Sequence, residues 1–274
     1  MKNGLILGFF DGVHAGHQAV IKSAVDYSEN PVLVTLKNFH KSDELIMTRK
    51  SSYEKAKKLG ITKIVEFDFF EVANLSAIEF LKLLNDKFSP ISISSGFNYT
   101  FGKNKSGNVN LLEEYQEKFG YKYFCVPPLK LDNTIVSSSL IKTLLSKGDV
   151  EKANKLLGSN FALNGIVKLG AQLGREIGFP TANIDYPEEI IKLPYGVYSV
   201  KLDDKIGVMN WGVKPTVNNT LKPILETHIV EFSEDLYGKN LNIEVLRRIR
   251  EEKKFNNLDE LKEQIKKDIE ECLK

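Results

Sequence analysis

Two histidines three positions apart, His14 and His17, follow a short apolar run near the start of the chain. Asp11 and Gly12 lie in the turn before them, and Gly16 lies between them. Residues at i and i+3 share one helix face, so both imidazoles are expected to face one ligand. Unpaired amides and the positive end of a helix favour phosphate, and nearby imidazoles are suited to stabilise charge on a phosphoryl group in transfer. The spacing therefore predicts a nucleotide phosphate site.

Two other interpretations of His14 and His17 are that they are polar surface residues near a turn, or that they bind a metal. Two of the chain's four histidines occur where an apolar run, glycines and a predicted helix start come together, which argues against both interpretations. Gly8 and Phe10 belong to the same turn and are predicted to contribute to phosphate binding. The nucleotide site is the favoured interpretation.

A second cluster of glycines precedes the segment Pro-Thr-Ala-Asn in the second half of the chain. Glycines such as Gly170 and Gly174 let backbone amides wrap phosphates. The hydroxyl of Thr181 and the amide carbonyl of Asn183 are hard oxygen ligands of the kind Mg²⁺ takes. The pattern thus indicates a metal–phosphate site, and the alternative is a barrel corner in which Thr and Asn make turn hydrogen bonds. Neither a Walker pattern nor a protein-kinase catalytic loop is present.

The elements that must position these residues differ between the two halves. Five short apolar runs are predicted to be strands: residues 5–10, 31–36, 62–69, 90–97 and 122–128. Helical stretches separate them, around residues 51–59, 76–87 and 110–118. This alternation predicts a Rossmann-like α/β fold with a parallel sheet, whose ligands bind outside the carboxyl ends of the strands. Residues 138–158 are predicted to be helical, with Gly158 as the stop.

After Gly158 the sequence changes to short apolar segments broken by glycine. Such segments predict a small antiparallel barrel or sandwich. Near the end of the chain, apolar residues recur about every fourth position from Leu261 to Leu273, which predicts an amphipathic terminal helix. The change in character places a domain boundary near 158–161.

Composition limits the classes of function. The 274 residues are 42% hydrophobic and 27% charged, which is typical of a folded protein, and the formal net charge of +2 argues against a nucleic-acid partner. Cys125 and Cys272 match no metal-ligand or disulfide pattern. No stretch approaches the roughly 18 apolar residues of a membrane span. We therefore expect a cytoplasmic protein with no membrane partner, and the sequence leaves open whether it forms a homo-oligomer.

The first half resembles a known enzyme module. The segments GFFDGVHAGHQAVI (8–21), SGFNYTFGKNKSGN (95–108) and VSSSLIKTLLSKGDVEKANKLLG (136–158) are similar, in order, to the main blocks of the FMN adenylyltransferase module of bacterial bifunctional riboflavin kinase/FAD synthetases. The resemblance implies that residues 1–158 adenylylate FMN to FAD and release pyrophosphate. It implies flavin binding by Asn98, Tyr99, Phe101 and Gly102. It implies ATP phosphate binding by Ser137, Ser138 and Ser139.

Three positions depart from the family pattern. Leu140 stands where the family commonly has an arginine, and Lys142 is expected to supply part of the missing charge. The segment TLKNFHK (35–41) lacks the usual His-Pro pair, and Asn98 replaces a common aspartate. The alternative hypothesis is therefore a riboflavin kinase with a weak or inactive adenylyltransferase domain.

The second half resembles the riboflavin kinase domain. The segments that carry the resemblance are, in order, GFPTANI, PYGVYSV, GVMNWGVKPTV, ETHIVEF and DLYGKNLNIEVLRRIREEKKF. The resemblance implies that residues 159–274 form a six-stranded Greek-key barrel with a terminal helix and phosphorylate riboflavin to FMN. It also implies that Thr181 and Asn183 engage Mg²⁺ and ATP.

The resemblance places the catalytic glutamate of the kinase at Glu244. A carboxylate near the hydroxyl is suited to accept its proton during phosphoryl transfer, and an acidic residue within an apolar strand needs a reason. A solvated outer face of the barrel is the alternative. Arg247 is predicted to bind the flavin, although a solvated basic face also explains it. A flavin-binding regulatory protein without turnover is a further, less favoured hypothesis.

Overall fold

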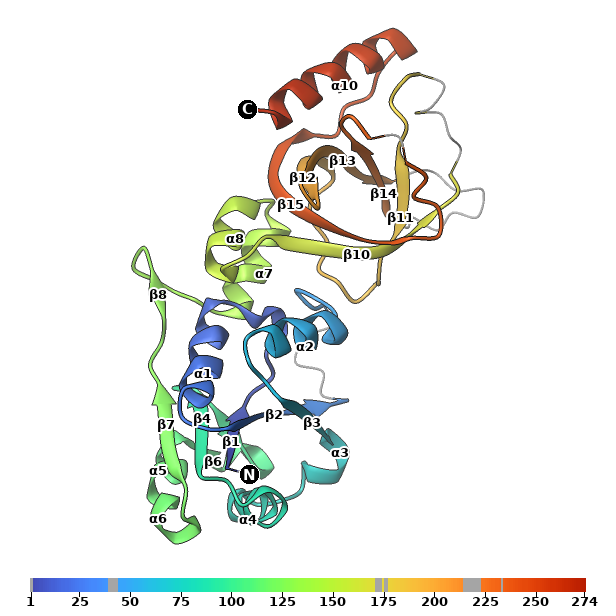
Figure 1. The fold of residues 1–274 in the computed structure, drawn as a ribbon. Helices are drawn as coiled ribbons and strands as arrows, with labels where there is room; N and C mark the ends of the chain where they lie inside the picture. Colours follow the sequence, from blue (N-terminus) through green and yellow to red (C-terminus); the bar gives the residue numbers. More distant parts are fainter. Residues whose placement is uncertain (1, 39–43, 171–173, 175–176, 214–222, 233) are drawn as a thin grey trace. The chain divides into compact units, whose positions relative to one another are not determined.

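The computed structural model describes residues 2–38, 44–170, 174, 177–213, 223–232 and 234–274. The chain divides into two compact units, Met1–Ser138 and Ser139–Lys274, and each is described by itself (Figure 1). The helices that follow Ser138 group with the second unit. The boundary at 158/159 stays a prediction about where two independently folding modules separate.

The first unit is built on a five-stranded parallel sheet with the strand order β3-β2-β1-β4-β7. The strands are β1 (Asn3–Leu7), β2 (Asn30–Lys37), β3 (Lys63–Asp68), β4 (Ser92–Gly96) and β7 (Lys122–Val126). All five predicted strands and the parallel α/β class are confirmed. Because β1 pairs with both β2 and β4, the connections leave it toward opposite sides, and this switch point is where ligands bind in open α/β sheets.

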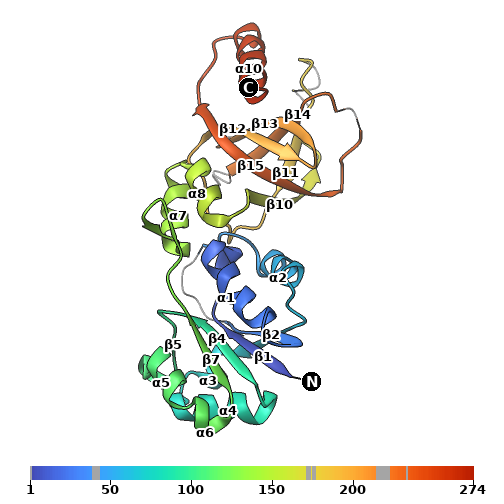
Figure 2. The same cartoon turned by 60° about the vertical axis from the view of Figure 1, so that its left-hand side comes forward.

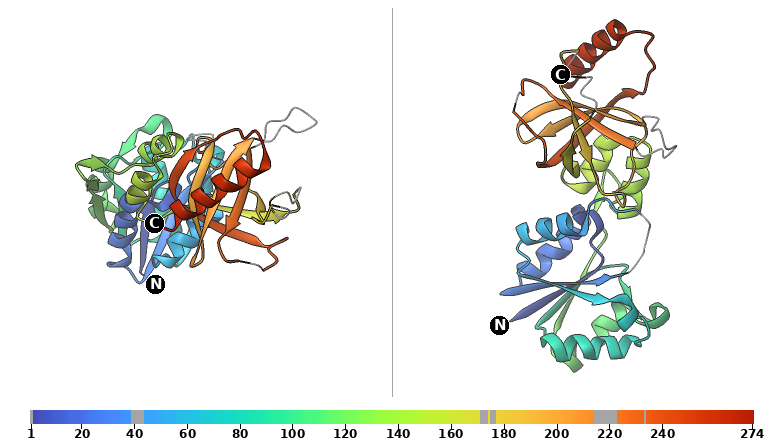
Figure 3. Two further views of the ribbon diagram at one scale, coloured as in Figure 1. Left: turned by 90° about the horizontal axis from the view of Figure 1, so that it is seen from above. Right: turned by 90° about the vertical axis from the view of Figure 1, so that its right-hand side faces the viewer.

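Helices cover both faces of the sheet (Figure 3, right). The main ones are α1 (Ala15–Val25), α2 (Arg49–Lys58), α4 (Ala77–Phe88) and α5 (Val109–Glu114), with short helices α3 (Phe69–Val72) and α6 (Gln116–Phe119). Alternation along β1 feeds both cores: Ile6 packs in the cluster with α1, while Leu5 and Leu7 pack in the cluster with α4. Burial on both faces explains why β1 and β2 are continuous apolar runs.

Two short hairpins were not predicted. They consist of β5 (Thr100–Phe101) with β6 (Gly107–Asn108), and β8 (Lys130–Leu131) with β9 (Thr134–Ile135). Each strand has two residues, which is too short for a hydrophobic period to be read from the sequence.

The second unit begins with two helices, α7 (Ser138–Ser146) and α8 (Val150–Leu157), where one helix was predicted. Gly148, with φ of 80°, lies between them in the left-handed region that favours glycine. Asp149 then caps α8, because its side chain accepts a hydrogen bond from Lys152 N. Gly158 ends α8 in the left-handed conformation, as predicted.

A closed barrel of six antiparallel strands follows, in the order β10-β11-β14-β13-β12-β15 (Figure 2). Its strands are β10 (Phe161–Lys168), β11 (Ala182–Asp185), β12 (Gly196–Leu202), β13 (Lys205–Val213), β14 (Pro223–Ile229) and β15 (Asn240–Glu251). Fully buried side chains fill its interior, Trp211 and Tyr198 being the largest. The predicted six-stranded barrel is confirmed.

Helix α10 (Leu258–Cys272) packs on the outside of the barrel and is the predicted terminal helix. Cys272 and Ile269 contact Val197 and Val208 in one apolar cluster. Cys125 is exposed and Cys272 is buried, and both are free. Within the described residues, no helix has the length and apolar character needed to cross a membrane.

Candidate functional site

The segment after β1, residues 8–17, forms a tight loop that we call the β1–α1 loop. Asp11–Val13 make one turn of 3₁₀ helix, and Phe10, Gly12 and Val13 all have positive φ, at 52°, 82° and 41°. Positive φ is strained for Phe and Val, and such strain persists only where the surroundings hold the chain in place. The loop is therefore a fixed structure at the sheet's switch point.

The two predicted histidines lie together at the start of α1. His14 is the N-cap residue, and its Nδ1 accepts a hydrogen bond from His17 N at 3.2 Å. The two rings stack with their centroids 3.6 Å apart. A Cβ on Gly16 would lie 3.2 Å from the His14 ring, so glycine leaves room for this stack. The prediction that both imidazoles share one face is confirmed by their stacking.

The serine-rich turn contacts the β1–α1 loop within the first unit. Ser138 Oγ donates to the carbonyl of Asp11 at 3.1 Å, and the buried Asp11 carboxylate accepts from Ile46 N at 2.9 Å. Ser137, the residue before Ser138, is half-buried. Ser139 and Lys142 lie further along α7, in the second unit. The structure thus joins Ser138, one of the three predicted serines, to the predicted phosphate site.

Lys55 of α2 is a member of this site that sequence reasoning missed. Its Nζ donates to the carbonyl of Gly12 at 3.4 Å, and burial lowers the pKa of its ammonium from 10.5 to about 8. In the sequence it is one of several lysines on a basic helix. Only the fold shows that it reaches the β1–α1 loop.

Two predicted phosphate-binding residues have packing positions instead. Phe10 is 3% exposed and packs with Ile6 and Val13 in the core. Gly8 lies against it, since a Cβ there would be 2.8 Å from the Phe10 ring. Only the backbone of this part of the loop is left for a ligand.

The predicted flavin-binding block divides in the same way. Phe101 is 7% exposed and lies against Phe80 of α4, with ring centroids 5.8 Å apart. Gly102 has φ of 72°, and a Cβ there would be 2.7 Å from Ala77 N. These two residues fix the block to α4. Tyr99 stacks on Phe101, with ring centroids 5.7 Å apart, and packs against the same core. Asn98 is exposed, so its side chain remains available to a ligand.

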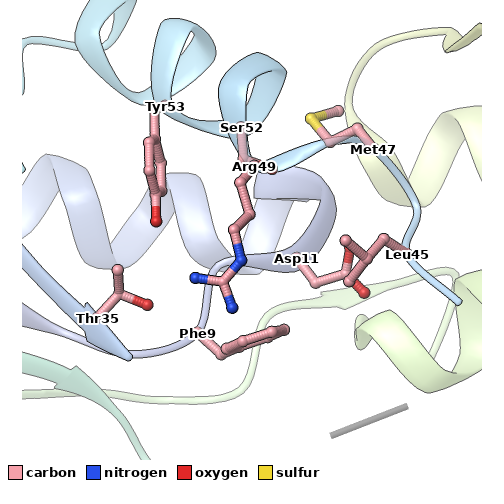
Figure 4. Close-up of a pocket in the computed structure, with 8 residues that line it drawn as sticks. All are labelled: Phe9, Asp11, Thr35, Leu45, Met47, Arg49, Ser52 and Tyr53. Atoms are coloured by element: carbon pink, nitrogen blue, oxygen red, sulfur yellow. The ribbon is translucent and has the colours of Figure 1, made fainter. Parts of the chain in front are cut away.

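A pocket at the carboxyl ends of β1 and β2 was also missed (Figure 4). It is lined by Phe9, Asp11, Thr35, Leu45, Met47, Arg49, Ser52 and Tyr53. Its apolar residues come from before and after residues 39–43. Those five residues, which include Phe39 and His40 of TLKNFHK, lie outside the described part of the chain. The pocket shares Asp11 with the β1–α1 loop.

In the second unit, the structure brings together the predicted metal–phosphate residues on the outside of the barrel. A Cβ on Gly170 would collide with the Asn183 side-chain amide, and one on Gly174 would lie 3.1 Å from Thr181 Oγ1. The glycines are thus in close contact with the two oxygen-bearing side chains. Both Thr181 and Asn183 are half-buried.

Glu226 is the neighbouring carboxylate, and it was not predicted. It lies directly opposite Asn183 in the antiparallel pair of β11 and β14, and directly opposed side chains have Cβ atoms about 4.5–5.5 Å apart. Like Asn183, it is half-buried on the outer side of the barrel. We call the surface carrying Thr181, Asn183 and Glu226 the β11–β14 face. The sequence signal for Glu226 was the alternation of polar and apolar residues in ETHIVEF, which predicts that Glu226 and His228 face outward.

The structure does not bring Glu244 to the β11–β14 face. Glu244 pairs with Ala162 of β10, whereas Asn183 pairs with Lys168 of the same strand. Six residues along a strand span roughly 20 Å. The Glu244 carboxylate instead accepts a hydrogen bond from Asn160 Nδ2 at 2.8 Å. This contact lies where the chain passes from α8 into the barrel, so Glu244 has a structural partner there.

Arg247 is held by the terminal helix. It forms an ion pair with Glu271, with Nη1 3.2 Å from Oε1, and also donates to the Glu271 carbonyl. Arg250 likewise pairs with the buried Asp268, at 2.8 Å. Neither arginine belongs to a solvated basic face, and the flavin contact predicted for Arg247 has no support in this arrangement.

Comparison with known proteins agrees with both halves of this description. The FAD synthetase family profile matches residues 2–140, and the riboflavin kinase profile matches residues 157–274. The chain belongs to the bifunctional riboflavin kinase/FMN adenylyltransferase family. It is 35% identical to the Bacillus subtilis member over 100% of this chain and 92% of that protein. The Escherichia coli member is 32% identical over 96% and 90%.

Among solved structures, a macrolide-efflux protein from Streptococcus pneumoniae has the same fold along nearly the whole chain. The TM-score is 0.87 at 28% identity, with 98% of this chain and 93% of that chain covered. The two-unit architecture is therefore shared by a relative of similar length.

Proposed function

We propose that the chain phosphorylates riboflavin to FMN at the β11–β14 face and adenylylates FMN to FAD at the β1–α1 loop, using ATP in both reactions. Membership of the bifunctional family supports the pair of activities. The observation that carries the placement of the kinase step is the register that sets Glu226 opposite Asn183.

In the kinase reaction, the riboflavin 5′-hydroxyl attacks the γ-phosphorus of ATP and ADP leaves. Glu226 accepts the hydroxyl proton, because it is the carboxylate that the barrel register sets beside Asn183. The backbone amides of Gly170 and Gly174 bind the phosphates. Glu244 has the structural role of joining the barrel to the chain segment after α8.

A magnesium ion fits the donor set of the β11–β14 face. The Thr181 hydroxyl, the Asn183 carbonyl oxygen and the Glu226 carboxylate are hard oxygens, and Mg²⁺ is usually held by few protein ligands together with substrate phosphates. When bound, the ion neutralises charge on the transferring phosphate. Thr181 and Asn183 would hold it.

In the adenylylation, a phosphate oxygen of FMN attacks the α-phosphorus of ATP, and pyrophosphate leaves. The stacked His14 and His17 stabilise the charge on the phosphorus group in transfer. The amides of the β1–α1 loop and the hydroxyls of Ser137 and Ser138 bind ATP phosphates. Asn98 contacts the flavin, and Tyr99 packs beneath this block.

Chromatography of the flavins tests this proposal. The chain is incubated with riboflavin, ATP and Mg²⁺, and we expect FMN to appear first and FAD after it. Chelation of the metal should stop the first step. A chain that forms FMN but never FAD would refute the second activity, and one that leaves riboflavin unchanged would refute the whole proposal.

A further inference from the structure

Arg49 is the first residue of α2, and its side chain reaches into the pocket at the ends of β1 and β2. The guanidinium lies over the ring of Phe9, 5.6 Å from its centroid. In Figure 4 it lies between Thr35 and Asp11. Helices favour acidic residues in the first turn, and α2 has none there. Helix stability therefore does not explain a cation at this position.

The hydrogen bonds of Arg49 fix the guanidinium and use one of its nitrogens. Nη1 donates to the Leu36 carbonyl and to Glu66 Oε1, both at 2.9 Å. The same Glu66 oxygen also accepts from the Tyr53 hydroxyl at 2.5 Å. Arginine–carboxylate ion pairs frequently use two guanidinium nitrogens. Here both bonds within the described residues come from Nη1, which leaves the edge formed by Nε and Nη2 for another partner.

The chemistry of the pocket defines that partner. A planar fork of two N–H groups matches the oxygens of a phosphate monoester. Phe9, Leu45 and Met47 place apolar groups beside the guanidinium. Asp11 belongs both to this pocket and to the β1–α1 loop, so an anion bound here lies beside the proposed adenylyl-transfer site.

We infer that Arg49 binds the phosphate of the acceptor flavin and thereby makes the adenylyltransferase select FMN over riboflavin. The inference rests on the proposed adenylylation at the β1–α1 loop. Arg49 holds the non-attacking oxygens of the FMN phosphate, while the remaining oxygen attacks the α-phosphorus of ATP and pyrophosphate leaves. Riboflavin has no phosphate, so its binding gains nothing from Arg49.

Steady-state kinetics of FAD formation by the full chain test this inference. Arg49→Met should raise the KM for FMN about 10- to 150-fold, the range for one charge-assisted contact. All chains are compared in a Glu226→Gln background, in which riboflavin is not converted to FMN, so that riboflavin serves as a competitive inhibitor against FMN; its inhibition constant should stay unchanged. Arg49→Lys keeps the charge but lacks the two-nitrogen fork. Its KM for FMN should lie between that of the unaltered chain and that of Arg49→Met. Lys50→Met, which removes an exposed charge from the same helix turn, is the matched control.

A structural role for Arg49 gives a different pattern. Loss of packing would raise the FMN KM and the riboflavin inhibition constant together, and either that result or an unchanged FMN KM would overturn the inference. The unaltered chain separates this from the proposed function: if it makes no FAD from FMN, the adenylyltransferase assignment fails, and the inference with it.

Discussion

The β1–α1 loop and the β11–β14 face both handle ATP in our account, but the fold assembles them in different ways. The loop draws Asp11, His14 and His17 from one continuous segment, because a parallel strand delivers the chain directly into a helix start. The face joins Asn183 to Glu226 only through the register of two antiparallel strands. Local sites can be predicted from spacing, whereas sites made by strand register need the pairing itself.

The largest difference in rate should come from replacing each of the two candidate carboxylates by an amide. Glu226→Gln should lower riboflavin phosphorylation by about 10²–10⁴-fold, as expected for loss of a general base. Glu244→Gln can still accept the Asn160 hydrogen bond and should change the rate by less than about 3-fold. Both rates are measured with saturating riboflavin and ATP. The reverse pattern would return the catalytic role to Glu244.

The next largest effect concerns the loop. His14→Ala should lower FAD formation from supplied FMN by about 10²–10³-fold, because the charge in transfer loses a preorganised donor. His17→Ala should act in the same direction. Riboflavin phosphorylation by the same preparations is the control and should be unchanged. Normal FAD synthesis in His14→Ala would remove the stacked pair from the mechanism.

Two fragments test where the second module begins. Asn154 of α8 accepts from Phe161 N at 2.7 Å and donates to Val245 O at 2.9 Å. A fragment 139–274 retains these bonds, whereas 159–274 loses them and should be less stable by about 2 kcal/mol or more. Urea denaturation of both measures the difference. Equal stability would support the boundary at 158/159.

The smallest effect is a pH dependence confined to the loop. The pKa of Lys55 is about 8, so its positive charge beside Gly12 is lost as the pH rises from 7 to 9. FAD formation should fall about 2- to 5-fold over this range relative to riboflavin phosphorylation, as for one lost charge interaction. Lys55→Arg stays charged over this range, so the ratio of FAD formation to riboflavin phosphorylation should no longer change with pH.

Unfolding would not mimic this pH effect. The unfolded chain keeps the Lys55 proton up to about pH 10.5, whereas the folded chain releases it near pH 8. Between these values the folded state binds fewer protons, so this group raises the free energy of unfolding as the pH rises. If FAD formation and riboflavin phosphorylation fell together between pH 7 and 9, the assignment of the pH effect to Lys55 would be contradicted.

Much of the fold followed from hydrophobic period and glycine position. The β1–β2 runs, the stop at Gly158 and the barrel segments all agree with the structure, because each is a local property of the chain. The break at Gly148 was missed, since the apolar period continues across it. A single glycine within a helical pattern is often tolerated.

The site was less predictable where packing and function compete for the same residue types. Phe10 and Phe101 looked like ligand contacts but fill cores, and Arg247 looked like a flavin contact but anchors α10. Nothing in the sequence distinguishes Lys55 and Arg49 from the other basic residues of their helix, yet Lys55 contacts the β1–α1 loop and Arg49 lines the neighbouring pocket. Whether a side chain packs in the core or contacts a ligand depends on neighbours that are distant in the sequence.

The most direct test of the central claim, that one chain carries two separate sites, is complementation between two inactive variants. Glu226→Gln and His14→Ala are each incubated with riboflavin, ATP and Mg²⁺, alone and mixed, and the flavins are separated by chromatography. We predict that Glu226→Gln leaves riboflavin, that His14→Ala stops at FMN, and that the mixture makes FAD. A mixture that makes no FAD, or a His14→Ala chain that makes no FMN, would contradict two independent sites.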